Sequence, residues 1–250
     1  GSGECWDDVV EHAVSNGWYG AENLSIIPGD VGASAVQNIG AYGVEAKDII
    51  HSIEALDIAT AEPRVFTAEE CNYSYRYSRF KDEWKGQYVI THVTYRLSKT
   101  FVPHTSYGNI QAELDSRGIS VPTARDVRDV IIGIRNAKLP DPKVEGNAGS
   151  FFMNPVVDAA FYEQLAAKYP GMPHYQAGEG KVKIPAGWLI DQCGWKGRVL
   201  GKAGVHSKQA LVLVNKGGAQ GADIIALSDA VCRDVKAKFG IDIHPEVNFV

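Results

Sequence analysis

The chain has 250 residues, 45% of them hydrophobic and 22% charged, which is the composition of an ordinary globular protein with one large domain or two smaller ones. Its net charge of -5 argues against a protein that binds nucleic acid through phosphate contacts. No apolar run approaches the roughly 20 residues that cross a bilayer, the 4 cysteines form no CxxC pair, and the 7 histidines lack metal-ligand spacing. We therefore expect a cytoplasmic protein with reduced thiols, no metal, and no membrane or nucleic-acid partner.

The first half of the chain mixes helical and strand patterns. Residues 6–14 (WDDVVEHAV) place apolar side chains at helical spacing, with acidic residues in the first turn. Residues 87–97 (QYVITHVTYRL) are rich in β-branched and aromatic residues and predict a strand. A shorter alternating stretch lies around residues 65–66.

A second helix is expected to begin near residue 123, with Val127 and Ile131 on its apolar face. Pro140 and Pro142 cannot continue it, so the LPDPK stretch ends the helix and marks a domain boundary. This predicts two domains, residues 1–138 and 139–250.

The second half also mixes the two kinds of element, so we expect an α+β protein. The patterns predict, in order, a turn over residues 146–155, a helix over 158–168, a loop with Pro170, Pro173 and Gly178, a strand over 209–215, an amphipathic helix over 222–239, and a terminal strand over 242–250.

Residues 29–43 (GDVGASAVQNIGAYG) form the most informative segment, because they carry almost no side-chain bulk. Such a segment lets the backbone approach a flat or charged ligand, and its peptide N–H groups could cradle a phosphate. A plain tight turn is the alternative, but a turn uses only two or three such residues. We interpret the segment as a cofactor-binding loop.

Residues 73–79 (YSYRYSR) place Arg76 and Arg79 among tyrosines and serines. Arginine suits bidentate contacts with carboxylate or phosphate and stacks on aromatic rings. The alternative is a solvated edge strand, but next to a cofactor loop an anion-holding arginine is the better interpretation.

Two residues of the second half could donate protons. Ser150 follows a glycine and precedes two phenylalanines, without the GxSxG pattern of a serine nucleophile, so it is either a turn serine or a hydroxyl donor in a dry aromatic pocket. Glu246 lies between apolar residues, where partial burial would raise its pKa and allow it to act as an acid. A glutamate facing water on an edge strand is the alternative for that position.

These segments together resemble the UDP-N-acetylenolpyruvoylglucosamine reductase (MurB) family, in its longer subtype. The matching motifs occur in the same order through nearly the whole chain, and six collinear motifs are highly specific. They are ENL…IPG…QNIGAYG at 22–43, YRYS at 75–78, LPDPK at 139–143, GSFFMNP at 149–155, AGWLI at 186–190, and PEV at 245–247.

The resemblance implies a two-domain FAD-binding fold of the vanillyl-alcohol-oxidase type, with the FAD-binding domain at residues 1–138 and an α+β substrate-binding domain at 139–250. It implies FAD and NADPH as cofactors, a UDP-sugar substrate, and a monomer that acts in peptidoglycan synthesis. The cofactor contacts would come from Pro28, Gly29, Gly32, Ser34, Gln37, Asn38, Ile39, Gly40, Ala41 and Tyr42.

The same resemblance implies the chemistry of an enolpyruvyl ether reduced by hydride transfer from NADPH through the flavin. Arg76 and Glu246 would stabilise the negative charge that develops at C2, and Ser150 would protonate that carbon. Because serine is a weak acid, this step needs a closed pocket, for which Phe151, Phe152 and the Tyr107 loop are candidate walls. Substrate contacts are implied for Tyr107, Lys138, Asn154, Tyr175, Lys183 and Gln209.

Two departures from the family pattern affect these expectations. Asn248 stands where some relatives have arginine, and the family's N-terminal phosphate loop has no counterpart, so we expect a fragment that starts within the cofactor domain. The alternatives are a non-catalytic UDP-sugar-binding fragment without FAD, and another flavoprotein of the same broad fold, such as an alcohol oxidase.

Overall fold

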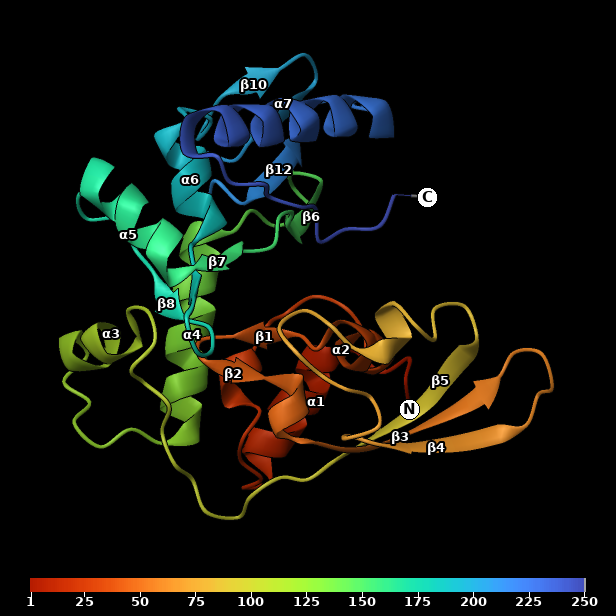
Figure 1. Cartoon of the computed structure of the whole chain (residues 1–250). Helices are drawn as coiled ribbons and strands as arrows, with labels where there is room; N and C mark the ends of the chain where they lie inside the picture. The colour runs from red at the N-terminus through yellow and green to blue at the C-terminus, as the bar shows by residue number, and fades with distance from the viewer. Residues whose placement is uncertain (250) are drawn as a thin grey trace. The chain divides into compact units, whose positions relative to one another are not determined.

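The computed structural model describes residues 1–249, which divide into two compact units, residues 1–137 and the part from Lys138 onward. Each unit combines helices with antiparallel strands (Figure 1). Helices and antiparallel sheets that are segregated in this way define the α+β class, so the fold class expected from the sequence is confirmed.

The first unit is built around a three-stranded antiparallel sheet with the order β4-β3-β5, beside a separate hairpin, β1-β2. Its helices are α1 (Trp6–Ser15), α2 (Val31–Gln37), α3 (Ile110–Ser116) and α4 (Ala124–Lys138), its short 3-10 helices are Glu22–Leu24, Ala46–Asp48 and Arg79–Lys81, and its strands are β1 (Gly40–Ala41), β2 (Val44–Glu45), β3 (Ile50–Asp57), β4 (Pro63–Thr67) and β5 (Tyr88–Tyr95).

Helix α1 follows the predicted amphipathic pattern. It buries Trp6, Val10 and Ala13 on one face and keeps acidic residues in its first turn, where they complement the helix dipole. The indole N–H of Trp6 donates to the main-chain oxygen of Leu24 at 2.8 Å, which fixes the following 3-10 helix against α1.

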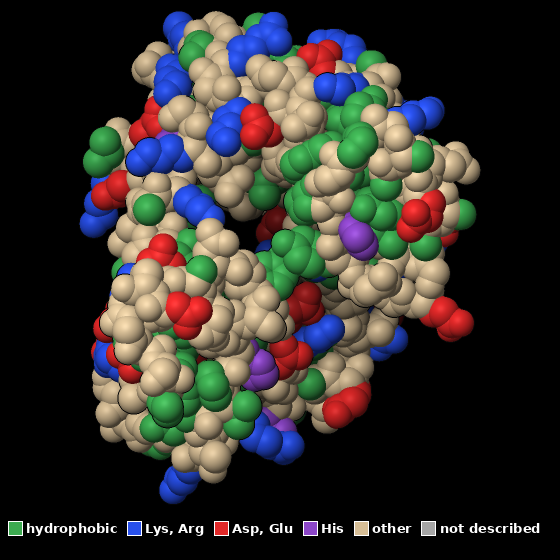
Figure 2. Space-filling model, turned by 90° about the vertical axis from the view of Figure 1, so that its left-hand side faces the viewer, with side chains coloured by type: hydrophobic (Ala, Val, Ile, Leu, Met, Phe, Trp, Pro, Cys, Tyr) green, Lys and Arg blue, Asp and Glu red, His purple; other side chains and the backbone are tan. Residues whose placement is uncertain are grey.

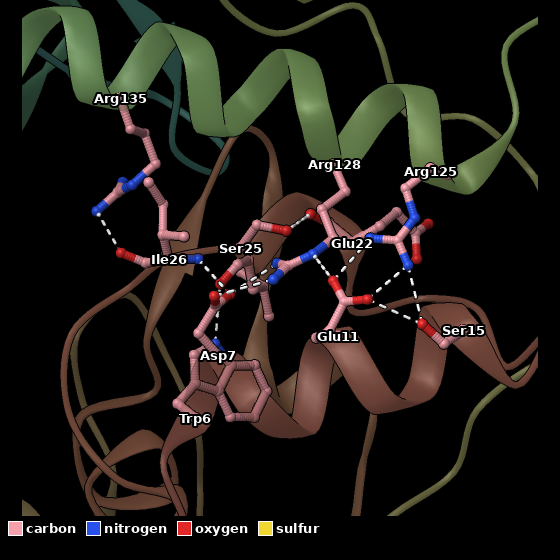
Figure 3. Close-up of polar contacts among 11 residues, drawn as sticks. Trp6, Asp7, Glu11, Ser15, Glu22, Ser25, Ile26, Arg125, Arg128 and Arg135 are labelled. Carbon is pink, nitrogen blue, oxygen red and sulfur yellow. Dashed lines mark hydrogen bonds and ion pairs between the residues drawn. The ribbon is translucent and has the colours of Figure 1, made fainter.

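Helix α4 begins with a reciprocal pair of hydrogen bonds between Thr123 and Asp126 and ends before Pro140, as predicted. Its buried face contains one charged residue, Arg128, whose side chain is only 5% exposed. Figure 3 shows Arg128 between Asp7 and Glu11 of α1, at 2.7 and 2.8 Å. Asp7 also accepts the N–H of Ile26 at 2.6 Å, so this ionic cluster joins α1 and α4 to the residues that precede the glycine-rich segment.

The β4-β3-β5 sheet buries one face. Ile53 pairs with Phe66 on β4 and Val93 on β5, and it is fully buried with its neighbour on the same face, Ala55. Helix α2 packs on β5. The strand predicted at residues 87–97 is therefore confirmed as β5, and the alternating stretch at 65–66 lies in β4.

The second unit contains two sheets, with the strand orders β10-β11-β12-β6 and β7-β9-β8. Its helices are α5 (Ala159–Lys168), α6 (Ala186–Gln192) and α7 (Gly221–Phe239), and its strands are β6 (Asn147–Ser150), β7 (Val156–Asp158), β8 (Tyr175–Gln176), β9 (Lys181–Lys183), β10 (Val199–Leu200), β11 (Ala203–Val205) and β12 (Val212–Asn215).

Helix α7 is the main cover of the larger sheet. It packs on β11, β12 and α6 and contributes Leu227, Val231 and Val235 to the core. A capping box between Gln220 and Asp223 starts the helix, and Gly240 ends it at φ 71°, a conformation that favours glycine. The predicted helices at 158–168 and 222–239 and the strand at 209–215 are confirmed.

Four local predictions are wrong. Residues 29–43 are not a loop, because α2 and the β1-β2 hairpin occupy most of them. Residues 147–150 are not a turn but strand β6, which pairs with β12, and the loop expected after Pro170 contains strand β8. Within the described part of residues 242–250, the expected terminal strand is reduced to an isolated bridge between Phe152 and Pro245; Val250 lies outside the described residues.

None of the helices in residues 1–249 is long and apolar enough to cross a membrane. The same residues contain no group of three or more His, Cys, Asp or Glu side chains arranged to hold a metal ion. On the face drawn in Figure 2, acidic and basic side chains are interspersed.

Candidate functional site

The glycine-rich segment is a helix followed by a tight hairpin. Tyr42 and Gly43 connect β1 to β2 with φ angles of 50° and 81°, so both central residues of this two-residue turn are left-handed, as in a type I′ hairpin. Gly29 precedes α2 at φ 113°, and its carbonyl accepts the N–H of Trp6 at 3.0 Å. Pro28 lies next to Gly29, and Gln37 is the last residue of α2.

The start of α2 does not form the phosphate cradle that the sequence suggested. The N–H of Val31 donates to the carbonyl of Glu4, and that of Gly32 to the carbonyl of Ser2, both at 2.9 Å. A Cβ on Gly32 would lie 2.9 Å from Cβ of Ser2, so glycine is needed there for the close approach of this chain's own residues.

Arg76 lies at the tip of a tight turn in which Ser74 and Tyr77 exchange main-chain hydrogen bonds. Its φ of 54° is left-handed, and its guanidinium lies 5.1 Å from the ring centroid of Tyr75. Nη2 donates to the carbonyl of Gly40 at 2.8 Å. The structure therefore brings the candidate anion-binding arginine directly to the cofactor segment.

Gly40 is the residue that permits this approach. A Cβ at this position would lie 2.9 Å from Cγ of Glu45 and 3.0 Å from Nη1 of Arg76. The carbonyl oxygen of Val44 would also lie 3.0 Å away, so a larger residue at this position would force these neighbours to shift.

Asn38 and Ser34 hold the segment in place with their side chains. Asn38 is fully buried and left-handed, and its amide donates to Glu45 at 3.0 Å and to the carbonyl of Ser74 at 2.7 Å, while accepting the N–H of Lys47. The Ser34 hydroxyl is 2.8 Å from the hydroxyl of Tyr95. Asn38 thus attaches the turn that carries Arg76 to the end of α2.

A cleft of about 270 Å³ lies beside α2 in the first unit. Typical pockets for whole ligands measure about 300–1,000 Å³, so this cleft is slightly smaller than that range. The sequence did not predict the aromatic residues that line this cleft, because the lining residues come from three separate segments of the chain. The lining residues are Ser2, Asp30, Gly32, Ala33, Val36, Phe80, Trp84, Gly86, Tyr88 and Ile90.

Tyr107 lies in the loop before α3, close to the hairpin turn. A Cβ on Gly43 would be 3.5 Å from Cβ of Tyr107, and one on Gly108 would be 3.7 Å from Cδ1 of Tyr42. Burial raises the pKa of Tyr42, and the nearby Arg135 guanidinium opposes this shift. Tyr107, predicted to contact substrate, therefore adjoins the predicted cofactor turn.

In the second unit the backbone brings Ser150 and Glu246 together. Ser150 ends strand β6 opposite Val212, and the next residue, Phe151, accepts the N–H of Glu246 through its carbonyl at 2.7 Å. Ser150 is exposed and Glu246 half-buried. Phe151 and Phe152 are 3% and 1% exposed in the hydrophobic core, so they do not line the dry pocket expected around the serine.

Four predicted substrate contacts lie near the start of α6. The side chain of Asn154 accepts the N–H of Ala186 at 2.9 Å, and a Cβ on Gly187 would lie 3.2 Å from Oε1 of Gln209. Lys183 and Tyr175 are partners across the β8-β9 pair, just before α6. Lys138 is exposed at the end of α4.

Comparisons with known proteins show which families the two parts of the chain match. Residues 1–68 match the FAD binding domain family, and residues 141–250 match the C-terminal domain of UDP-N-acetylenolpyruvoylglucosamine reductase. Proteins named UDP-N-acetylenolpyruvoylglucosamine reductase are similar over nearly the whole chain. That of Bacteroides fragilis (strain YCH46) is 59% identical over 100% of this chain and 74% of its own length, and that of Burkholderia vietnamiensis is 50% identical over 98% and 71%.

A solved structure shows the same fold. UDP-N-acetylenolpyruvylglucosamine reductase (MurB) from Thermus caldophilus aligns with a TM-score of 0.66 at 21% identity, over 99% of this chain and 70% of its own. The FAD-binding match and the reductases to which the chain is similar define an FAD-linked oxidoreductase. More specifically, the chain belongs to the UDP-N-acetylenolpyruvoylglucosamine reductase family.

Proposed function

We propose that this protein reduces the enolpyruvyl ether of UDP-N-acetylglucosamine enolpyruvate to UDP-N-acetylmuramate, with FAD as its cofactor and NADPH as the reductant. Identity of 50–59% to reductases of that name over nearly the whole chain supports the proposal most strongly. The family places this reaction in peptidoglycan synthesis, in the cytoplasm, and we extend both assignments, with a monomeric state, to this protein.

The first unit fits part of an FAD site. A cleft with aromatic walls lies along α2, and the Arg76 guanidinium is held beside Gly40 of β1. We assign residues 1–138 to the FAD-binding domain, with contacts from Pro28, Gly29, Gly32, Ser34, Gln37, Asn38, Ile39, Gly40, Ala41 and Tyr42. When bound, FAD would accept a hydride from NADPH and, once reduced, would supply it to C3 of the enol ether.

Three side chains would stabilise the negative charge at C2 of the substrate and supply the proton that this carbon receives. Arg76, already held beside Gly40, would stabilise the negative charge that spreads from C2 into the substrate carboxylate. Glu246 would help to polarise the enolpyruvyl group, and Ser150 would give its hydroxyl proton to C2. Ser150 is exposed, so its donor role requires that substrate itself exclude water from this position.

The second domain, residues 139–250, would bind the substrate together with Tyr107 and Lys138. Asn154 and Gln209 lie near the first turn of α6, and Lys183 is beside Tyr175, which gives polar, cationic and aromatic groups in one unit. These groups suit a diphosphate and a sugar. We assign substrate contacts to Tyr107, Lys138, Asn154, Tyr175, Lys183 and Gln209.

An absorbance experiment tests the proposal. The protein is saturated with FAD, freed of unbound flavin, and mixed anaerobically first with NADPH and then with the enolpyruvyl UDP-sugar. We expect the flavin absorbance to bleach and then recover with one equivalent of UDP-N-acetylmuramate formed. Flavin that is retained and bleached but never reoxidised by the enol ether would contradict the proposed substrate.

A further inference from the structure

Asn23 joins two segments that the proposed function assigns to different ligands. Its side-chain amide donates to the carbonyl of Tyr42 at 3.0 Å and to the carbonyl of His104 at 2.9 Å. Tyr42 lies in the turn of the cofactor segment, and His104 lies in the loop that continues to Tyr107. The residue is 1% exposed, so water does not compete for these two bonds.

The two segments are irregular at the points where Asn23 contacts them. Tyr42 is in a left-handed turn, and residues 101–105 belong to no helix or strand. Segments of this kind depend on side chains for hydrogen bonds that regular structure would otherwise supply. One amide therefore fixes both of them relative to the 3-10 helix Glu22–Leu24.

Direct packing strengthens the connection. The turn at Tyr42 and Gly43 packs against Tyr107 and Gly108. A Cβ built on Gly43 would lie 3.5 Å from Cβ of Tyr107, and one built on Gly108 would lie 3.7 Å from Cδ1 of Tyr42. The ring of Tyr42 also packs on the hydrophobic cluster of Ile110 and Leu114. A displacement of the Tyr42 turn should therefore move the Tyr107 loop, and a displacement of the loop should move the turn.

The hydrogen bonds of the Asn23 side chain also indicate that it connects the two segments. Its Oδ1 is buried and accepts no hydrogen bond from the residues that the structure describes, which carries a free-energy cost. The side chain of Asn23 therefore stabilises the structure through the two hydrogen bonds that its Nδ2 donates, and not through its Oδ1.

We propose that Asn23 is a positioning residue that holds the Tyr107 loop against the cofactor turn, so that substrate binding at Tyr107 depends on the geometry of Tyr42. The assignment of the two segments to substrate and cofactor rests on the proposed function. The mechanical link between the segments does not.

Hydrogen exchange of the 250-residue chain tests the link without any turnover. In Asn23→Ala we expect the amides of residues 40–44, 102 and 104–108 to exchange together, at least about 10-fold faster, which corresponds to about 1.4 kcal/mol. Ser25→Ala is the matched control, because Ser25 is a buried polar residue beside the same 3-10 helix but bonds only to Glu22. Unchanged exchange in Asn23→Ala, or an equal change in Ser25→Ala, would overturn the proposal.

If Asn23→Ala does not fold, Asn23→Asp keeps the shape and turns a carboxylate oxygen toward the two carbonyls. The protection factors of both segments, calculated relative to the intrinsic exchange rate at each pH, should be low at neutral pH and should rise in acid, where the carboxyl can donate a proton. Protection factors that do not change with pH in this variant would also overturn the link.

Steady-state kinetics then tests the coupling to substrate. In the FAD-loaded protein, Asn23→Ala should raise KM for the enolpyruvyl UDP-sugar about 10-fold, with a smaller change in kcat, and Ser25→Ala should not. Faster exchange with an unchanged KM would overturn the substrate part of the proposal. If the unmodified protein shows no turnover, that result would instead count against the proposed function. Hydrogen exchange would still test whether Asn23 connects the two segments.

Discussion

Nη2 of Arg76 donates a 2.8 Å hydrogen bond to the main-chain oxygen of Gly40, although 36 positions separate the two residues in the sequence. The arginine adopts a left-handed backbone at the tip of a turn, and Asn38 attaches that turn to the end of α2. A cationic side chain is thus fixed against the glycine-rich segment, as the proposed electrostatic stabilisation by Arg76 requires.

Gly40→Ala should displace the Arg76 guanidinium. The new Cβ would lie 3.0 Å from Nη1 and 2.9 Å from Cγ of Glu45, so one of the two side chains must move. We expect a destabilisation of about 1–3 kcal/mol and a loss in kcat of about 10-fold or more. Gly3→Ala is the control, since nothing lies within 4 Å of its Cβ position. Equal activity of the two variants would contradict the positioning of Arg76 by Gly40.

Arg76→Lys keeps the charge but removes the planar fork that bonds Gly40 and could bond a carboxylate. We expect NADPH to reduce the flavin at the normal rate and the enol ether to reoxidise it about 10²-fold more slowly. Stopped-flow absorbance separates these half-reactions. Arg64→Lys, at an exposed position of β4, should change neither of them, and a normal reoxidation rate in Arg76→Lys would remove Arg76 from the reaction.

The ionic cluster between α1 and α4 should make stability depend on acid pH. Hydrogen bonds from Arg125, Arg128 and Ser15 lower the pKa of Glu11. Burial raises the pKa of Asp7, but hydrogen bonds from Arg128 and the Ile26 N–H, with the Arg128 charge, outweigh it and leave that pKa lowered. A carboxyl with a lowered folded-state pKa contributes stability above its unfolded pKa, about 3.9 for Asp and 4.3 for Glu, and loses it as pH falls below.

The free energy of unfolding should therefore stay constant above about pH 5 and decrease as pH falls through 4. In the Glu11→Gln variant the decrease should be shallower, and the starting stability lower, because Arg128 loses a charged partner while only 5% exposed. Urea unfolding from pH 3 to pH 7 measures both effects. An unchanged acid slope in Glu11→Gln would show that this cluster does not control acid stability.

The cysteines should differ in reactivity. Burial raises the pKa of Cys71 to about 11, whereas Cys5 is exposed. Since the thiolate is the reactive form, iodoacetamide at pH 8 should modify Cys5 and leave Cys71 unmodified in the folded chain. Peptide mass spectrometry after brief labelling checks this, with a urea-unfolded sample as the control in which both residues react. Rapid labelling of Cys71 in the folded chain would contradict its burial.

Strong local patterns predicted the long elements correctly. Helices α1 and α4 follow from apolar spacing and from the prolines after Lys138, and β5 follows from its β-branched and aromatic residues. These patterns depend only on residues close together in the sequence, so they can be recognised without knowledge of the tertiary structure.

The errors come from segments whose structure depends on distant partners. Residues 29–43 suggested a loop by their glycines, but Val31 and Ala35 bury one face of α2, which packs on β5. Strand β6 exists because β12 pairs with it from more than 60 residues away, and the buried aromatic pair Phe151 and Phe152 suggested a pocket where the structure has core. No local pattern encodes such pairings.

The site residues divide in the same way. Motif similarity predicted Arg76, Ser150 and Glu246 as catalytic residues and Gly40 as a cofactor contact. It did not predict the contacts of Gly40 with Arg76, of Asn23 with His104 or of Arg128 with Asp7, because each joins residues far apart in the sequence.

The most direct test of the proposed chemistry is the rate of flavin reoxidation in Ser150→Ala, with Ser207→Ala, an exposed serine of the same unit, as the control. If Ser150 protonates C2, NADPH should reduce the flavin normally, whereas the enolpyruvyl UDP-sugar should reoxidise it about 10²–10⁴-fold more slowly. Reoxidation at the rate of the unmodified protein, or an equal slowing of both half-reactions, would contradict the account.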